Sequence, residues 1–396
     1  MLEGLLGTPP KAAMKQVLIE GWRGISQSFA MVNQYQLIEL SKIEGLALSH
    51  LDLPFSNPAW SQTRNDPFFS ETASQVIESI PAPQEQCFDA AYNISFPFRR
   101  PLTSAKKAIT FMTGEFGLLP TSFAAGTVAA EDFLGANDLI TVPSHWSRMK
   151  VIEYGFPAEK VVVVPHGVSP EVFSPVPEQG RQDVRVHIGL QPEHFVFLNV
   201  GAMTWNKGID VLLLAFAEVR RRHAHARLVL KDASTLYGIQ GANVVARFAE
   251  ENPAQAADIL SSVKVISSGL PLYQMRLLYA AADAYVSPYR AEGFNLPVIE
   301  AIACGIPAVV TAGGPTDDFC EPRTAWPVRS DQVQNSEKAV PGGGYHLEPR
   351  LDSLIEQMGA ALAEGRAGTG TFAAGRSHLV ETFSWAAAAR QLAALF

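Results

Sequence analysis

The chain alternates short apolar runs with longer helical patterns, and this series occurs twice along the sequence. Short apolar runs separated by amphipathic helices are typical of parallel sheets that are covered by helices on both faces. A proline-rich stretch between residues 165 and 192 separates the two series. The sequence therefore predicts an α/β protein with two doubly wound, Rossmann-like parallel-sheet domains. Ligands of such sheets bind at the carboxyl ends of the strands, so a cleft between the two domains is the expected binding site.

The two series predict where the elements lie. In the first half, strands are expected at residues 16–20, 46–51, 90–95, 108–113, 139–142 and 161–164, with helices at 28–42 and 145–154. In the second half, strands are expected at 195–200, 227–230, 263–266, 284–287 and 308–311, with helices at 209–222, 274–282 and 296–304. This pattern divides the chain into an N-terminal domain of residues 1–168, a linker of 169–192 and a C-terminal domain of 193–383. The amphipathic run 384–396 predicts a last helix that packs back on the N-terminal domain.

Composition excludes several classes of protein. The net charge is −8 and the basic residues are scattered, which argues against a nucleic-acid partner. The three cysteines are too few and too far apart for a disulfide framework or a zinc cage. No apolar run approaches the roughly 18 residues of a membrane span, and residues 1–15 lack the apolar core of a signal peptide. We therefore expect a cytoplasmic protein, with peripheral contact at the inner membrane face left open.

The segment from Glu292 to Pro307 carries the most specific chemical information. Asn295 is a good N-cap, and Pro297 suits the first turn of a helix, where its missing amide hydrogen costs nothing. The loop before this helix presents the backbone amides of residues 293–296 at the helix N-terminus. Such an end attracts anions, so it suits a diphosphate.

Two glutamates flank this helix end. Glu300 lies about one turn into the helix, and its carboxylate, which only accepts hydrogen bonds, suits a ribose diol rather than a phosphate. Glu292 lies on the loop and would face whatever is attached beyond the phosphates. The alternative for each is a charge in solvent.

The run AYVSPYRAEGFNLPVIEAIACGIPAVVT, residues 284–311, resembles the donor-site signature of family 4 of the retaining glycosyltransferases (glycosyltransferase group 1), which have the GT-B fold. The resemblance implies that Glu300 holds the ribose and that Glu292 contacts the transferred sugar. It also implies that the backbone of Gly293, Phe294, Asn295 and Leu296 lies near the sugar and diphosphate. Asn295 replaces the commoner glycine; asparagine tolerates unusual backbone angles, so we expect the loop to keep its shape.

The loop after the strand at 195–200 resembles a second landmark of this family. In the family this loop carries a diphosphate-binding lysine just before a glycine, which implies that role for Lys207. Gly201 begins the loop, and the family often has an arginine next, where this chain has Ala202. We expect Thr204 or backbone amides to replace part of the missing positive charge.

The N-terminal half shows two weaker features. The turn from Glu20 to Gly24 resembles the glycine-rich turn that approaches the donor phosphate, with Gly24 as a donor contact and Arg23 as a substitute cation; an ordinary tight turn is the alternative. Glu115 stands near the position of a family histidine that helps to place the sugar. It is either a contact to the sugar or acceptor or part of a structural turn. His145 and His166 are not spaced as a metal pair, so structural roles are expected for both.

The resemblance implies transfer of a hexose-type sugar from a nucleoside diphosphate sugar to a glycan, lipid-linked or other hydroxyl acceptor, with retention of anomeric configuration. It also implies no cofactor and no metal, with Glu292, Lys207 and Glu115 as the catalytic groups. One alternative is a GT-B scaffold or nucleotide-binding protein with impaired catalysis, which the absent arginine favours. A weaker alternative, an NAD-type oxidoreductase, lacks Gly-x-Gly-x-x-Gly after the first strand.

Overall fold

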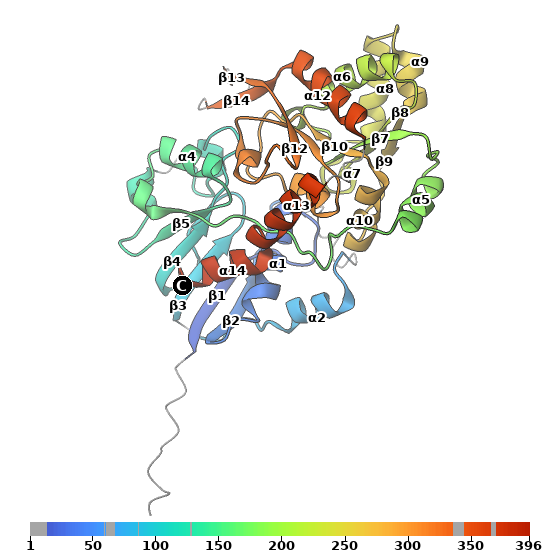
Figure 1. Ribbon diagram of the computed structural model, residues 1–396. Helices are drawn as coiled ribbons and strands as arrows, with labels where there is room; N and C mark the ends of the chain where they lie inside the picture. The colour runs from blue at the N-terminus through green and yellow to red at the C-terminus, as the bar shows by residue number, and fades with distance from the viewer. Residues whose placement is uncertain are drawn as a thin grey trace, which may run out of the picture.

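The structure is a computed structural model that describes residues 14–396, except residues 59, 61–67, 86, 127–128, 336–343 and 366–369. The described residues form two six-stranded parallel sheets flanked by helices and one two-stranded antiparallel ribbon (Figure 1). The strand orders are β2-β1-β3-β4-β5-β6 and β12-β11-β10-β7-β8-β9. Each order reverses beside the first strand of its sheet, which is where a doubly wound sheet opens its binding crevice.

The N-terminal sheet owes its stability to strands that are buried on both faces. Val17 and Ile19 of β1 pack in the same cluster as the helix that follows, whereas Leu18 between them packs on the opposite face. The strands are β1 (Lys15–Gly21), β2 (Leu46–Asp52), β3 (Phe88–Ile94), β4 (Ala105–Phe111), β5 (Leu139–Val142) and β6 (Val161–Val163). The helices are α1 (Ser28–Leu40), α2 (Glu71–Ser79), α3 (Ala130–Phe133) and α4 (His145–Glu153).

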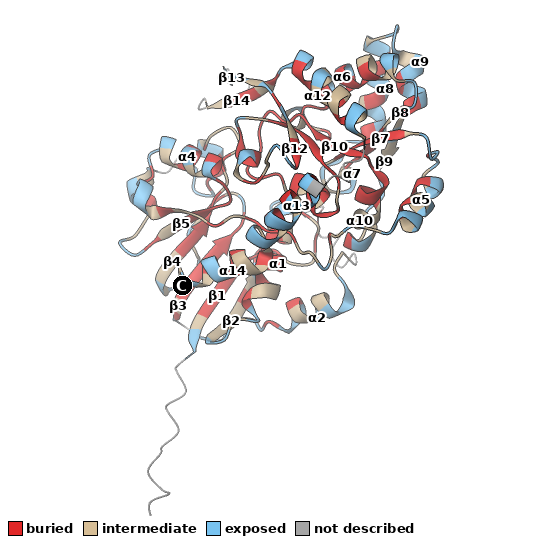
Figure 2. Ribbon diagram, viewed as in Figure 1, coloured by how far each residue is buried: buried red, intermediate tan, exposed pale blue. Residues whose placement is uncertain are grey.

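The C-terminal sheet repeats this plan, and Figure 2 shows buried residues along the strands of both sheets. Its strands are β7 (Phe195–Val200), β8 (Ala226–Lys231), β9 (Val263–Ile266), β10 (Ala284–Ser287), β11 (Ala308–Thr311) and β12 (Ala325–Val328). Its helices are α6 (Ile209–Arg222), α7 (Ser234–Tyr237), α8 (Gly241–Glu251), α9 (Ala256–Ser262), α10 (Leu272–Ala281), α11 (Leu296–Ala303), α12 (Leu351–Glu364) and α13 (Gly370–Thr382). The ribbon pairs β13 (Ser330–Gln334) with β14 (Tyr345–Pro349).

The stretch between the domains is less irregular than its prolines suggest. It contains a helix, α5 (Glu178–His187), that packs against α10. Arg181 and Arg185 of this helix are buried and both pair with the carboxylate of Asp283. The sequence predicted a linker without a helix here, and α5 was missed because buried ion pairs with Asp283, rather than an apolar stripe, hold this helix in place.

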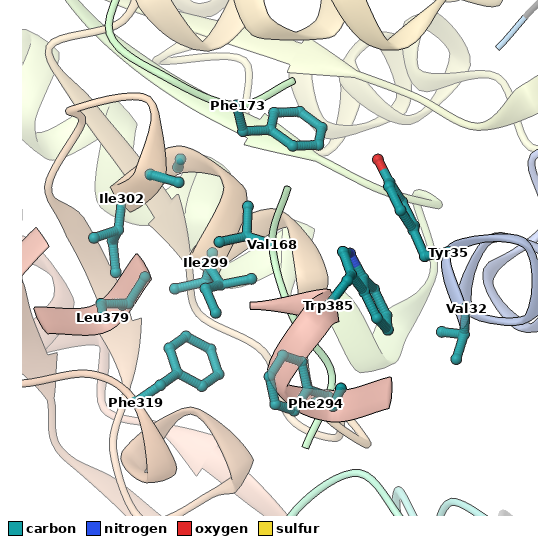
Figure 3. Close-up of a cluster of buried hydrophobic side chains, with 14 of the residues drawn as sticks. Val32, Tyr35, Val168, Phe173, Phe294, Ile299, Ile302, Phe319, Leu379 and Trp385 are labelled. Carbon is teal, nitrogen blue, oxygen red and sulfur yellow. The ribbon is translucent and has the colours of Figure 1, made fainter. Parts of the chain in front are cut away.

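The chain ends on a helix that returns to the N-terminal domain, as predicted. This helix, α14 (Trp385–Ala393), packs along α1. The ring of Trp385 stacks on that of Tyr35, with 4.9 Å between centroids and 6° between planes. Gly167 has no room for a side chain, because a Cβ atom there would lie 2.2 Å from the backbone nitrogen of Trp385. Figure 3 shows that this contact continues into the apolar core around Ile299 and Phe294.

Candidate functional site

A cavity of about 460 Å³ lies between the two domains, where the strands of both sheets end. Its walls come from α1 and the loop after β4 on the N-terminal side, and from the loops after β7, β8, β9 and β10 on the C-terminal side. The domains also touch at its mouth, where the indole nitrogen of Trp60 donates to the carbonyl of Leu236 over 2.9 Å. A shallower depression of about 630 Å³ lies at the other end of the N-terminal strands, beside Lys106 and Lys107. Those lysines are already bonded to Asp89 and to the carbonyl of Leu395.

The start of α11 points into the cavity, as the sequence predicts. Asn295 precedes the helix in the left-handed region, with φ 77° and ψ 65°. It is the N-cap by position, but its side chain makes no cap hydrogen bond and instead donates to Ser287 Oγ over 3.0 Å. Asn295 thus adopts the left-handed backbone conformation that glycine favours. Because no side chain caps the helix end, its backbone N–H groups are free of a side-chain acceptor that would compete with an anion.

Gly293 presses directly against the N-terminal domain. A Cβ atom on this residue would lie 1.9 Å from Thr113 Oγ1. The carbonyl of Gly293 accepts hydrogen bonds from Ser144 Oγ at 2.6 Å and from Ser147 Oγ at 3.1 Å. The loop thus needs glycine here because the Thr113 side chain of the N-terminal domain lies directly against the Gly293 backbone.

Three charged side chains meet across the cavity. Lys207 Nζ forms an ion pair with Glu292 Oε1, and Glu115 approaches the pair from the N-terminal domain. Glu115 Oε2 accepts a hydrogen bond of 3.3 Å from Asn206 Nδ2. Burial, followed by repulsion from Glu292, raises the pKa of Glu115 to about 7. Burial alone would lower the pKa of Lys207, but the two carboxylates raise it, so the lysine stays charged.

Glu300, one turn into α11, lines the same cavity. Its Oε2 accepts a hydrogen bond of 2.7 Å from the hydroxyl of Tyr279. Burial raises the pKa of Glu300 to about 7, and the bond from Tyr279 lowers it only in part. The solvated alternative is wrong for this residue, since its carboxylate belongs to the cavity wall beside Leu272 and Met275.

The cavity gathers most of the predicted site residues. They are Glu115, Gly201, Thr204, Lys207, Glu292, Gly293, Phe294, Asn295, Leu296 and Glu300. Gly24 is the exception: it is not among the described lining residues, and its N–H donates to Gln34 Oε1 over 2.9 Å. Its φ of 77° makes it a turn residue that leads to Ser26 and Ser28, which do line the cavity.

Arg23 does not replace the missing cation. Its guanidinium forms a two-pronged ion pair with Asp52, with N–O distances of 3.0 and 2.9 Å. Lys231 is the cation that sequence reasoning missed: it ends β8, is buried and lines the cavity. Its place at the carboxyl end of a predicted strand is the signal by which it could have been found. Burial lowers its pKa, and its Nζ donates to the carbonyl of Asp232.

His166 and Asn206 also line the cavity without having been predicted as contacts. His166 stacks on Phe111, and burial lowers its pKa to about 3, so it is neutral. His145 is exposed and lies 3.2 Å from Asp318. Within the described ranges, no group of three or more His, Cys, Asp or Glu side chains is arranged to hold a metal ion. No described helix is long and apolar enough to cross a bilayer.

Two facing Rossmann-like sheets with the cleft between them define the GT-B class, which the sequence predicted. Solved glycosyltransferases share this fold over the whole chain. A glycosyltransferase from Rickettsia africae superposes with a TM-score of 0.66 at 14% identity, covering 96% of this chain and 97% of the other. An Anabaena protein, HepE, solved with UDP-glucose, gives a TM-score of 0.65 at 14% identity over 96% and 98% of the two chains.

Sequence comparison finds similarity to known proteins mainly in the C-terminal domain. Residues 180–339 match the sequence model of the family described as "Glycosyl transferases group 1". A D-inositol 3-phosphate glycosyltransferase from Kineococcus radiotolerans is 32% identical over 197 residues. That alignment covers 48% of this chain and 43% of the relative, so the chain spans less than half the length of this curated relative.

Proposed function

We propose that the chain is a retaining glycosyltransferase that moves a hexose-type sugar from a nucleoside diphosphate sugar to a hydroxyl acceptor. The observation that carries this proposal is the arrangement of one cavity wall. A helix end, Lys207, Glu292 and Glu300 all line this cavity, and together they supply groups that suit a diphosphate, a sugar and a ribose. The HepE structure, which holds UDP-glucose, supports the same class of donor.

The groups on this wall act on the leaving diphosphate. The bond between the anomeric carbon and the diphosphate oxygen breaks, and a new bond forms from that carbon to the acceptor oxygen. The acceptor proton passes to the departing phosphate. Lys207 and the start of α11 stabilise the negative charge that grows on the diphosphate, which is the stage at which fixed dipoles and charges accelerate a reaction most.

Before the donor binds, Lys207 and Glu292 neutralise each other in an ion pair. A diphosphate carries more negative charge than one carboxylate, so it competes with Glu292 for the lysine. Glu292 is then available to accept hydrogen bonds from hydroxyls of the transferred sugar. Glu115 reaches the same region from the N-terminal domain and accepts from the sugar or from the acceptor hydroxyl. Protein groups thus supply the charge stabilisation, and we expect no bound metal and no cofactor.

The acceptor side of the cavity favours an uncharged substrate. Among the described lining residues, the two lysines both come from the C-terminal domain, and the charged residue of the N-terminal wall is the carboxylic acid Glu115. Apolar surface from Phe29, Met31 and Phe111 accompanies it. An acceptor phosphate would find no cation among these residues. We therefore do not extend to this chain the phosphorylated acceptor that appears in the name of the relative, a D-inositol 3-phosphate glycosyltransferase. A neutral sugar or alcohol with an apolar face fits this wall.

The experiment is turnover of UDP-, GDP- and ADP-sugars with a panel of hydroxyl acceptors, followed by NMR of the product. We expect release of one nucleoside diphosphate and an anomeric coupling that matches the donor, with no loss of rate after addition of EDTA. An inverted product would contradict the retaining assignment, and loss of rate in EDTA would contradict the metal-free one. Nucleotide binding without turnover of any pair would favour the impaired scaffold that Ala202 suggests.

A further inference from the structure

One buried hydroxyl in the cavity wall has no hydrogen-bond partner among the described residues. Tyr35 of α1 is 5% exposed and lines the cavity, and its phenolic oxygen is shielded from water and unpaired. An unpaired buried hydroxyl destabilises a folded protein, so such groups are normally satisfied by the protein or by a ligand. The position of this hydroxyl therefore indicates a ligand contact.

The ring of Tyr35 is held in one orientation. Trp385 of α14 stacks on one face, and Phe69 meets the ring edge to face at 5.0 Å and 70°. Figure 3 shows Tyr35 beside Trp385, with its hydroxyl at the end of the ring away from Val32. Because two aromatic neighbours fix the ring, the hydroxyl is preorganised for its ligand.

The ribose-binding candidate of the other domain lies within electrostatic range. Glu300 lines the same cavity and, after burial itself, is the second cause of the raised pKa of Tyr35. One carboxylate oxygen of Glu300 accepts from Tyr279, and no described residue donates to its Oε1. The wall thus presents a free acceptor from α11 near an unpaired hydroxyl from α1. A vicinal diol supplies two neighbouring hydroxyls that match this pair.

We propose that Tyr35 completes the ribose site, with its hydroxyl bonded to one ribose hydroxyl while the other donates to Glu300. This assignment rests on the proposed function, because it requires a nucleotide in the cavity. The ribose then joins α1 of the N-terminal domain to α11 of the C-terminal domain. Since α14 holds Tyr35 in place, the C-terminal helix contributes to donor binding without touching the donor.

The test is calorimetric titration of the wild type, Tyr35→Phe and Tyr289→Phe with UDP, GDP and ADP. Tyr289 is the matched control, because its buried hydroxyl bonds to Thr316 at 2.8 Å and it does not line the described cavity. The nucleotide that binds best is then compared with its 2′,3′-dideoxy form. Tyr35→Phe should weaken binding of the ribonucleotide about 5- to 10-fold and binding of the dideoxy form less than 2-fold. Tyr289→Phe should bind both as the wild type does.

Each outcome decides between the two claims. If the wild type binds none of the three nucleotides, the proposed function fails and the Tyr35 assignment fails with it. If the wild type binds and Tyr35→Phe binds equally well, or loses as much with the dideoxy form, only the Tyr35 assignment is overturned. The Tyr35→Phe variant keeps the aromatic stack on Trp385. General damage to the fold would weaken binding of the ribonucleotide and of the dideoxy form equally, and such an equal loss would count against the assignment.

Discussion

At the scale of single residues, the site is a set of carboxylates whose charges depend on pH. Glu115 and Glu300 both have a pKa raised to about 7, and burial is the main cause for each. Glu292 instead pairs with Lys207. All four residues were proposed from the sequence, Glu292 and Glu300 from the predicted helix start and Lys207 and Glu115 from the family resemblance. It did not reveal two of their hydrogen-bond partners, because Tyr279 reaches Glu300 from the preceding helix α10 and Asn206 reaches Glu115 across the two domains.

The Glu115 side chain is predicted to give the reaction a pH dependence near neutrality. Only its carboxylate form accepts hydrogen bonds with both oxygens, and that form grows as pH rises through about 7. We expect kcat to rise between pH 6 and 8 in the wild type, and the rise to be lost in Glu115→Gln. The check is a pH–rate profile of both proteins at saturating donor. An unchanged profile in the variant would show that Glu115 is only part of a turn.

The Glu300 side chain is predicted to trade stability for nucleotide binding. Its folded pKa lies above that of an unfolded glutamate, so its contribution is present below about pH 4.5 and is lost as pH rises through about 7. Glu300→Gln removes this loss and keeps an acceptor for Tyr279. The ligand-free variant should therefore be more stable than the wild type at pH 8, on the order of 1–2 kcal/mol, and no more stable at pH 5. Denaturant unfolding at both pH values checks this, and equal stabilities at pH 8 would contradict it.

At the scale of elements, the repeating strands and helices could be predicted, whereas their exceptions could not. The predicted strands were found with their ends within three residues, because continuous apolar runs report burial on both faces. Helix α5 was missed, since its stability depends on Asp283, about 100 residues away. The sequence also could not show why residue 293 must be glycine: Thr113 of the other domain lies too close for a side chain.

That approach predicts a pair of coupled mutations. Gly293→Ala places a methyl group where Thr113 Oγ1 lies, so it should force the domains apart and lower kcat/KM about 10- to 100-fold. Thr113→Ala alone should have a small effect. The double variant should recover a large part of the activity, because the nearest clashing atom is gone. Steady-state kinetics of the four proteins tests this, and equal losses in the single and double Gly293 variants would argue against a clash at this contact.

At the scale of the whole molecule, the fold brings a C-terminal wall that carries two lysines against an N-terminal wall of different character. The sequence indicated this division, and the return of α14 to α1 was predicted from its amphipathic pattern. Apart from Glu115, the N-terminal wall could not be predicted, because Ser26, Phe29 and Phe111 belong to no recognisable motif. These residues line a binding cavity only because the fold places the two domains against each other.

The character of the N-terminal wall predicts acceptor preference. Neutral sugars or alcohols should be glycosylated at least 10-fold more efficiently than the same compounds with a phosphate, since Glu115 is the charged residue of the N-terminal wall and no described cation lies on that wall. Paired assays with each acceptor and its phosphate ester measure the ratio of kcat/KM. A preference for the phosphate ester would mean that this wall does not receive the acceptor in the manner we propose.

The central claim is that the wall around α11 and Lys207 binds a nucleoside diphosphate. Its most direct test is a thermal-shift measurement of the wild type and Lys207→Ala with UDP, GDP and ADP. A ligand that binds only the folded state stabilises it by about 2.7 kcal/mol at 100 times its Kd. We predict that at least one of the three raises the Tm of the wild type by several degrees and raises that of Lys207→Ala much less. No shift with any nucleotide, or equal shifts in both proteins, would contradict the account.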